Sequence, residues 1–262
     1  MAGPHIQELF TEAPGRLFTH YGFETGSPGV RRRRIFVYLP EAYLDMRRKR
    51  FPVLYLLDGQ NVMDLESSRY GGWKTNVAAE RLAQEGRITP PVVVGIAASS
   101  QRLREYMGWS QEPNHRHVAG EKHCAYVLEQ VVPFIESQYR ISNRRRSRIV
   151  GGASAGGVAA LHMAFSYPTV FGGVGVLSAG RHFFPELARR FLAGEPPDLR
   201  IFLSCGTRGM DSELYPQTRA FCGRLKAARM EYRYVHRRRG AHNERSWASV
   251  MPEMLEYFFS VE

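Results

Sequence analysis

Residues 149–165 read IVGGASAGGVAALHMAF, and this stretch decides the fold that we expect. A short apolar run leads into a cluster of glycine, alanine and serine, and an alanine-rich segment follows. This order predicts a buried strand, a sharp turn and a helix. The residues of the turn, 152–156, fit the pattern G-x-S-x-G with Ser154 at the centre.

The same alternation of strand and helix extends along most of the chain. Alternating strands and helices predict right-handed crossovers and a mostly parallel sheet with helices on both faces, which is an α/β fold. No repeat or linker divides the sequence, so we expect a single domain over residues 1–262. The expected strands are 35–40, 52–58, 91–98, 148–152, 173–178, 200–205 and 231–236; the expected helices are 73–84, a long one around 127–135, 155–166, 185–192, 215–227 and 244–259, with a loop near 104–120.

Composition excludes several other classes of protein. With 44% hydrophobic and 12% aromatic residues in 262, the chain can bury a sizeable core and is not a disordered protein. No apolar run approaches the roughly 18 residues of a membrane helix. The first residues lack a basic segment followed by an apolar run, and the three cysteines are far apart, so we expect a cytoplasmic protein without disulfides.

The formal net charge is +11, and only four of the 36 cationic residues are lysines. A codon bias toward arginine would explain the positive charge without any function. Alternatively, the charge would serve to attract an anionic substrate or a nucleic acid. The arginines cluster at 31–34, 47–50, 144–148 and 237–239, beside expected strand ends and turns. No zinc-finger spacing or RNA-binding aromatic pattern accompanies them, so we expect no nucleic-acid partner.

Ser154 is the candidate nucleophile. The sharp turn holds the serine in a strained conformation above the sheet, where the start of the next helix favours developing negative charge. A serine hydroxyl needs a base, and four histidines follow it in the chain. His242 comes between the last strand and the last helix, at the same sheet edge as Ser154. His162 lies on the helix of the serine itself, His182 in a loop, and His236 at a strand end.

An acid that orients the histidine is expected between positions 154 and 242. Asp198 precedes a strand and lies at the wrong sheet edge, whereas Asp211 follows a strand and lies at the right one. We therefore predict Asp211; Glu213 and a serine–histidine pair without an acid remain as alternatives.

Two backbone N–H groups are expected to bind the oxyanion. One belongs to Ala155, directly after the nucleophile, and the other to Gln60 in the turn LLDGQN, where Gly59 permits a tight bend. We expect no metal and no cofactor, because His115 and His117 have no carboxylate or cysteine at a matching spacing.

Several stretches together resemble the esterase family that includes esterase D, feruloyl esterases and enterobactin-type siderophore esterases, which are α/β-hydrolases. The resemblance implies an α/β-hydrolase fold, Ser154 as nucleophile, His242 as base and the LLDGQN turn in the oxyanion hole. It also implies that the segment with Glu105 and Tyr106 shapes the mouth of the pocket. We expect Gly59, Glu105, Tyr106 and Trp109 to contact the substrate. The matching stretches are RIFVYLP, FPVLYLLDGQN, GGWKTN, PPVVVGIAASSQRLREY, VVPFIESQYRI, RIVGGASAGGVAALHMAFSYPTVFGGVGVLSAG and GAHNERSW.

One position departs from the family pattern. The family places its acid three residues after the glycine that ends the seventh strand, and this chain has Gly209 there, two residues before Asp211.

The predicted function is therefore that of a serine esterase that hydrolyses a small-molecule ester through an acyl-enzyme. The polar segment 104–120 favours a small soluble ester with an aromatic or catecholate, siderophore-type acid part over a lipid, and Tyr106, Met107 and Trp109 could stack on it. An acyltransferase of the same fold and a non-catalytic ligand-binding protein are the alternatives.

Overall fold

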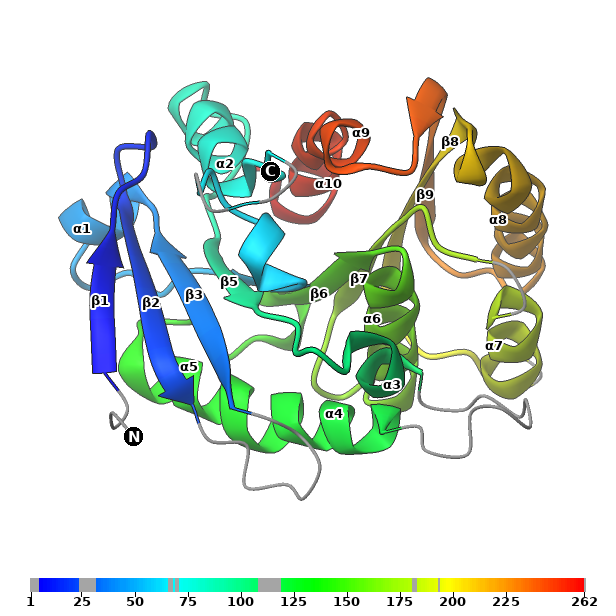
Figure 1. Ribbon diagram of the computed structural model, residues 1–262, viewed down its shortest axis with the longest axis horizontal. Coiled ribbons are helices and arrows are strands. Elements are labelled where there is room, and N and C mark those ends of the chain that lie inside the picture. The colour runs from blue at the N-terminus through cyan, green and yellow to red at the C-terminus, as the bar shows by residue number, and fades with distance from the viewer. Residues whose placement is uncertain are drawn as a thin grey trace.

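The computed structural model describes residues 5–23, 32–65, 68, 71–107, 119–180, 183–192 and 194–261. The strands of these ranges form one nine-stranded sheet in the order β1-β2-β3-β5-β4-β6-β7-β8-β9 (Figure 1). The strands are β1 (His5–Leu9), β2 (Arg16–Phe23), β3 (Arg33–Leu39), β4 (Val53–Leu57), β5 (Val92–Ile96), β6 (Arg148–Ala153), β7 (Gly173–Leu177), β8 (Arg200–Arg208) and β9 (Tyr232–Ala241).

The sheet is mixed but mostly parallel. Strands β4 to β9 pair in parallel, whereas β1, β2 and β3 pair antiparallel to their neighbours. The predicted α/β class is thus confirmed, and among the strands the sequence missed β1 and β2, which lie at one side of the sheet. Strand β1 is almost wholly exposed and β2 is only half-buried, so neither has the continuous apolar run that marked the central strands.

Helices cover both faces of the sheet. Helices α2, α9 and α10 lie on one face, and α4, α5 and α6 lie on the other (Figure 1). The helices are α1 (Glu41–Asp45), α2 (Thr75–Gln84), α3 (Arg102–Tyr106), α4 (Gly120–Tyr126), α5 (Val132–Gln138), α6 (Ala155–Ser166), α7 (Phe183–Phe191), α8 (Met210–Ala227), α9 (Glu244–Ala248) and α10 (Met251–Phe259), with a π-helical segment at Val127–Val131 and 3-10 turns at Gly59–Asn61 and Arg145–Ser147.

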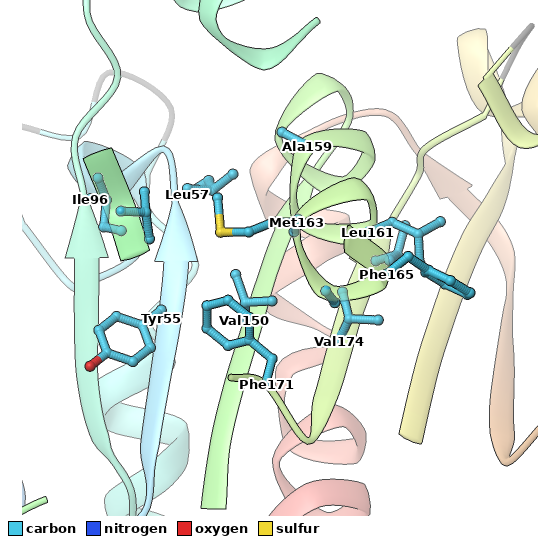
Figure 2. Close-up of a cluster of buried hydrophobic side chains, with 14 of the residues drawn as sticks. Tyr55, Leu57, Ile96, Val150, Ala159, Leu161, Met163, Phe165, Phe171 and Val174 are labelled. Carbon is cyan, nitrogen blue, oxygen red and sulfur yellow. The ribbon is translucent and has the colours of Figure 1, made fainter. Parts of the chain in front are cut away.

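The larger core lies between the sheet and α6. Tyr55, Val150 and Val174 project from three neighbouring strands toward Met163 of α6 and Phe171, and all of these side chains are fully buried (Figure 2). Burial of such side chains contributes about 1.5–3 kcal/mol each. This packing fixes α6 on the sheet and therefore fixes the turn that precedes it.

Two boundaries differ from the sequence prediction in a way that affects the site. Strand β8 continues to Arg208 and α8 begins at Met210, so Asp211 lies in the first turn of a helix instead of a loop. Strand β9 continues to Ala241, so His242 directly follows its end. In the described part of the chain, no helix is both long enough and apolar enough to cross a membrane.

Candidate active site

Ser154 occupies the turn between β6 and α6. Its backbone has φ 57° and ψ −129°, a conformation that costs about 1–3 kcal/mol and persists only where the surroundings enforce it. Its N–H donates to the carbonyl of Leu177 at 2.8 Å. A Cβ atom at Gly152 would lie 2.6 Å from the backbone of Gly156, so the turn can close only with glycine at that position. The small residues of the motif thus produce the strained turn that the sequence predicted.

His242 lies between Ser154 and Asp211. Its Nε2 is 2.9 Å from the Oγ of Ser154, and its Nδ1 is 2.8 Å from Oδ1 of Asp211. With the imidazole proton on Nδ1 donated to Asp211, Nε2 is left to accept the proton of the serine hydroxyl. The three residues follow the ends of β6, β8 and β9 in the chain, and these strand ends meet at the carboxyl edge of the sheet.

Asp211 is fully buried and strongly hydrogen-bonded. Its Oδ2 accepts from the hydroxyl of Ser178 at 2.7 Å and from the N–H of Gly206 at 2.9 Å. Burial alone would raise the pKa of the carboxyl. The hydrogen bonds from His242, Ser178 and Gly206 together outweigh burial and hold the pKa of Asp211 below its usual range. The alternative acid, Glu213, is exposed on α8.

Ser178 and Trp247 form a second layer behind the acid, and the sequence analysis did not identify either residue. The indole N–H of Trp247 donates to Ser178 Oγ at 2.9 Å, which leaves the serine proton directed at Asp211. The Trp247 ring also packs edge-on against the ring of His242, with centroids 5.2 Å apart. Two signals were available: Ser178 directly follows strand β7, and Trp247 lies on the short helix that begins just after His242.

The turn after β4 lies beside the serine. Gly59 packs so closely on β5 that a Cβ atom there would lie 2.3 Å from the backbone of Gly95. The Gln60 side chain accepts from the N–H of Ala98 at 2.9 Å. Because the first N–H groups of a helical turn have no partner within it, the N–H groups of Gln60 and of Ala155, the first residue of α6, are suited to bind an anion.

Asp58 and Arg102 brace this turn. Asp58 has a left-handed backbone, with φ 61°, and its carboxylate accepts two hydrogen bonds from Arg102, at 2.6 and 2.7 Å. The hydroxyl of Tyr106 accepts from the N–H of Asp58 at 3.1 Å. A Cβ atom at Gly156 would lie 2.9 Å from Oδ2 of Asp58, so this carboxylate touches the nucleophile turn.

Two residues predicted to contact substrate lie beneath the site. Glu105 is fully buried and pairs with Arg33 at 3.0 Å, and Tyr106 is 1% exposed. Their contacts are with the protein, so in this structure they shape the site from below. Gly59 is also buried, whereas Trp109 lies outside the described residues.

Glu244 is a further carboxyl group that the sequence analysis did not identify. It is 9% exposed, and its Oε1 accepts from the side-chain amide of Asn61 at a long 3.4 Å. Burial, with the negative charge of Asp58 adding to it, raises the pKa of Glu244. This contact links the turn after β4 to the segment that carries His242.

The remaining histidines lie elsewhere or outside the description. His162 is buried on α6, 3.8 Å from the sulfur of Cys124, and His236 packs against Tyr215. His182, His115 and His117 are not among the described residues, and within those residues no cluster of three His, Cys, Asp or Glu side chains could hold a metal ion.

A strained serine at the carboxyl edge of a mostly parallel sheet, hydrogen-bonded to a histidine that faces a buried aspartate, defines an α/β-hydrolase architecture. Residues 30–258 match the model of the family described as "Putative esterase", and the chain belongs to this family of hydrolases.

Individual relatives are more distant. The uncharacterized protein YbbA of Bacillus subtilis (strain 168) is 27% identical over 186 residues, which are 67% of this chain and 68% of that protein. A solved ferulic acid esterase has a TM-score of 0.72 at 20% identity and covers 95% of this chain and 98% of its own. The ferric enterobactin esterase of Salmonella typhimurium has a TM-score of 0.70 at 19% identity, covering 96% of this chain and 59% of its own. At these identities the two structures establish a shared fold.

Proposed function

We propose that this protein is a serine esterase that hydrolyses carboxylic esters through an acyl-enzyme. Ser154 attacks the ester carbonyl, and His242 takes its proton and then gives it to the departing alcohol. Asp211 holds the imidazole in the productive tautomer. The observation that carries this proposal is the hydrogen-bonded chain from Ser154 Oγ through His242 to Asp211, with distances of 2.9 and 2.8 Å.

The oxyanion of the tetrahedral intermediate is bound by the backbone N–H groups of Ala155 and Gln60. Both lie at the start of a helical turn beside Ser154, and the packing of Gly59 on β5 keeps the second donor in place. Water then repeats the attack with His242 as base and releases the acid, so the cycle needs no cofactor.

For the substrate, we propose a small ester with an aromatic or catecholate acid part. This choice is supported by the names of two proteins with the same fold, a ferulic acid esterase and a ferric enterobactin esterase. In the sequence, the aromatic residue Trp109 follows α3 closely, and an indole ring is a suitable stacking partner for such a group.

Labelling with a fluorophosphonate probe, combined with a panel of esters, tests the proposal. We expect stoichiometric labelling of Ser154, and a fall in ester turnover of at least about a thousandfold in Ser154→Ala, because the attacking group is lost. The panel contains short-chain nitrophenyl, feruloyl and catecholate-lactone esters. Ser137→Ala, which removes an exposed serine on α5, is the control and should change neither result. Absence of labelling, or an active Ser154→Ala protein, would refute the assignment.

A further inference from the structure

A cavity of about 280 Å³ adjoins the turn that carries Gln60. It is lined by residues from the start of β3, the end of β5 and the bend of β2. The lining residues are Gly22, Arg32, Arg33, Arg34, Gln60, Ala97 and Ala98.

The cavity opens at the same sheet edge as Ser154. The strand order is β3-β5-β4-β6, and β3 runs antiparallel to β5, so the start of β3 lies beside the end of β5, where the N–H of Ala97 donates to the carbonyl of Arg34 at 3.1 Å. Three strand spacings of about 4.8 Å place the far wall roughly 14 Å from the strand that carries Ser154. Gln60 belongs to both places: its side chain reaches the cavity, and its N–H lies in the turn beside the serine.

The walls of the cavity are cationic. No acidic side chain occurs among the described residues that line it. Arg33 is buried and its charge is balanced by Glu105. Arg34 is exposed, its guanidinium lies 5.3 Å from the centre of the Phe36 ring, and no ion pair of the described residues involves it. This ring contact positions the guanidinium of a residue that lines the cavity, and it does not neutralise the charge.

We propose that this cavity binds an anionic oxygen group, such as a carboxylate, of the ester whose carbonyl lies at Ser154. The inference rests on the proposed esterase function and narrows it to esters that carry a negative charge at a distance from the scissile bond. A guanidinium suits this task because it is always charged and presents its N–H donors in a planar fork that matches a carboxylate.

Matched esters that differ by one charge test the inference. The probes are 4-nitrophenyl monoesters of dicarboxylic acids from adipic to sebacic acid, each compared with its neutral methyl-capped analogue. We expect a higher kcat/KM for the charged ester of one chain length. We also expect that preference to shrink with salt, because screening shortens the reach of the charge.

Variants at Arg34 show whether the preference comes from this cavity. Arg34→Gln should lower kcat/KM for the charged ester by roughly fivefold and leave the neutral ester unchanged, whereas Arg34→Lys should retain most of the preference. Arg48→Gln is the matched control, because it removes the same charge from an exposed position before β4, at the opposite sheet edge. An equal loss in Arg48→Gln and Arg34→Gln, or equal rates for both esters, would overturn the inference.

A binding measurement separates this inference from the esterase proposal. Titration of Ser154→Ala with monomethyl suberate and with dimethyl suberate requires no turnover. Tighter binding of the monoanion that weakens in the Ser154→Ala/Arg34→Gln protein supports the cavity even if no ester is hydrolysed. Equal binding of the two compounds overturns it even if Ser154 is a working nucleophile.

Discussion

Asp211 and Glu244 are two buried carboxyl groups near His242, yet their surroundings shift their pKa values in opposite directions. Asp211 receives hydrogen bonds from an imidazole, a hydroxyl and a backbone N–H, all between 2.7 and 2.9 Å. Glu244 receives one side-chain hydrogen bond, of 3.4 Å, and faces the negative charge of Asp58.

The hydrogen bonds that each carboxylate receives therefore decide the direction in which its pKa shifts. Burial penalises the charge of either group, and only short hydrogen bonds to the carboxylate offset that penalty. An acid that balances a developing imidazolium has to remain ionised, and of these two groups Asp211 has the surroundings that the proposed role requires.

The largest expected effect comes from removing the charge of Asp211. Asp211→Asn should lower kcat by about ten-thousandfold, because an amide no longer selects the productive tautomer of His242. Glu213→Gln, on the exposed face of α8, should stay near the rate of the unmodified protein. Steady-state kinetics on a nitrophenyl ester measures both. If Glu213→Gln lost its activity and Asp211→Asn kept it, Glu213 would be the acid. Unchanged rates in both variants would mean that Ser154 and His242 act without an acid.

The sequence singled out Ser154, Asp211 and His242 as candidates because each of them follows a strand within a few residues, and strand ends are visible as the limits of apolar runs. It did not show that Asp211 lies in the first turn of a helix, because the stretch GTRGMDSE between the expected strand and helix reads as a loop. Ser178 and Trp247 were missed because residues 69 apart meet only through the packing of α9 on the sheet.

The sequence also did not show that Glu105 has a buried partner far away in the chain. The segment with Glu105 and Tyr106 suggests a pocket mouth, but Glu105 pairs with Arg33, which lies 72 positions earlier in the chain. Only the three-dimensional structure shows that Glu105 and Tyr106 turn inward.

An intermediate loss of kcat is expected when Ser178 or Trp247, the two residues behind Asp211, is replaced. Ser178→Ala removes one of the donors that keep the carboxylate ionised, and a hydrogen bond to a charged group contributes about 1.5–3 kcal/mol, so kcat should fall by at least about tenfold with little change in KM. Trp247→Phe retains a ring against His242 but loses the indole donor, and should cost less.

A double substitution separates positioning from general damage. If Ser178 acts through Asp211, then Ser178→Ala should cost almost nothing further in kcat once Asp211→Asn is present. A full additional loss in that background would mean that Ser178 serves the fold alone, and the comparison between the two carboxyl groups would lose its physical basis.

The smallest effect is expected at Glu244, and it concerns stability. Because the folded protein raises the pKa of this carboxyl, ionising it disfavours folding, and that cost appears as pH rises from the usual range of a glutamate through the raised value. Glu244→Gln should therefore match the unmodified protein in acid and exceed its stability above neutral pH, by about 1 kcal/mol at most. Urea denaturation across this pH range measures the difference. Glu129→Gln, which removes an exposed carboxyl within the π-helical segment Val127–Val131, should show no such pH-dependent gain. If Glu244→Gln were instead less stable than the unmodified protein at high pH, the Glu244 carboxylate would be stabilised in the folded protein, as that of Asp211 is. The long hydrogen bond from Asn61 would then outweigh the cost of burial.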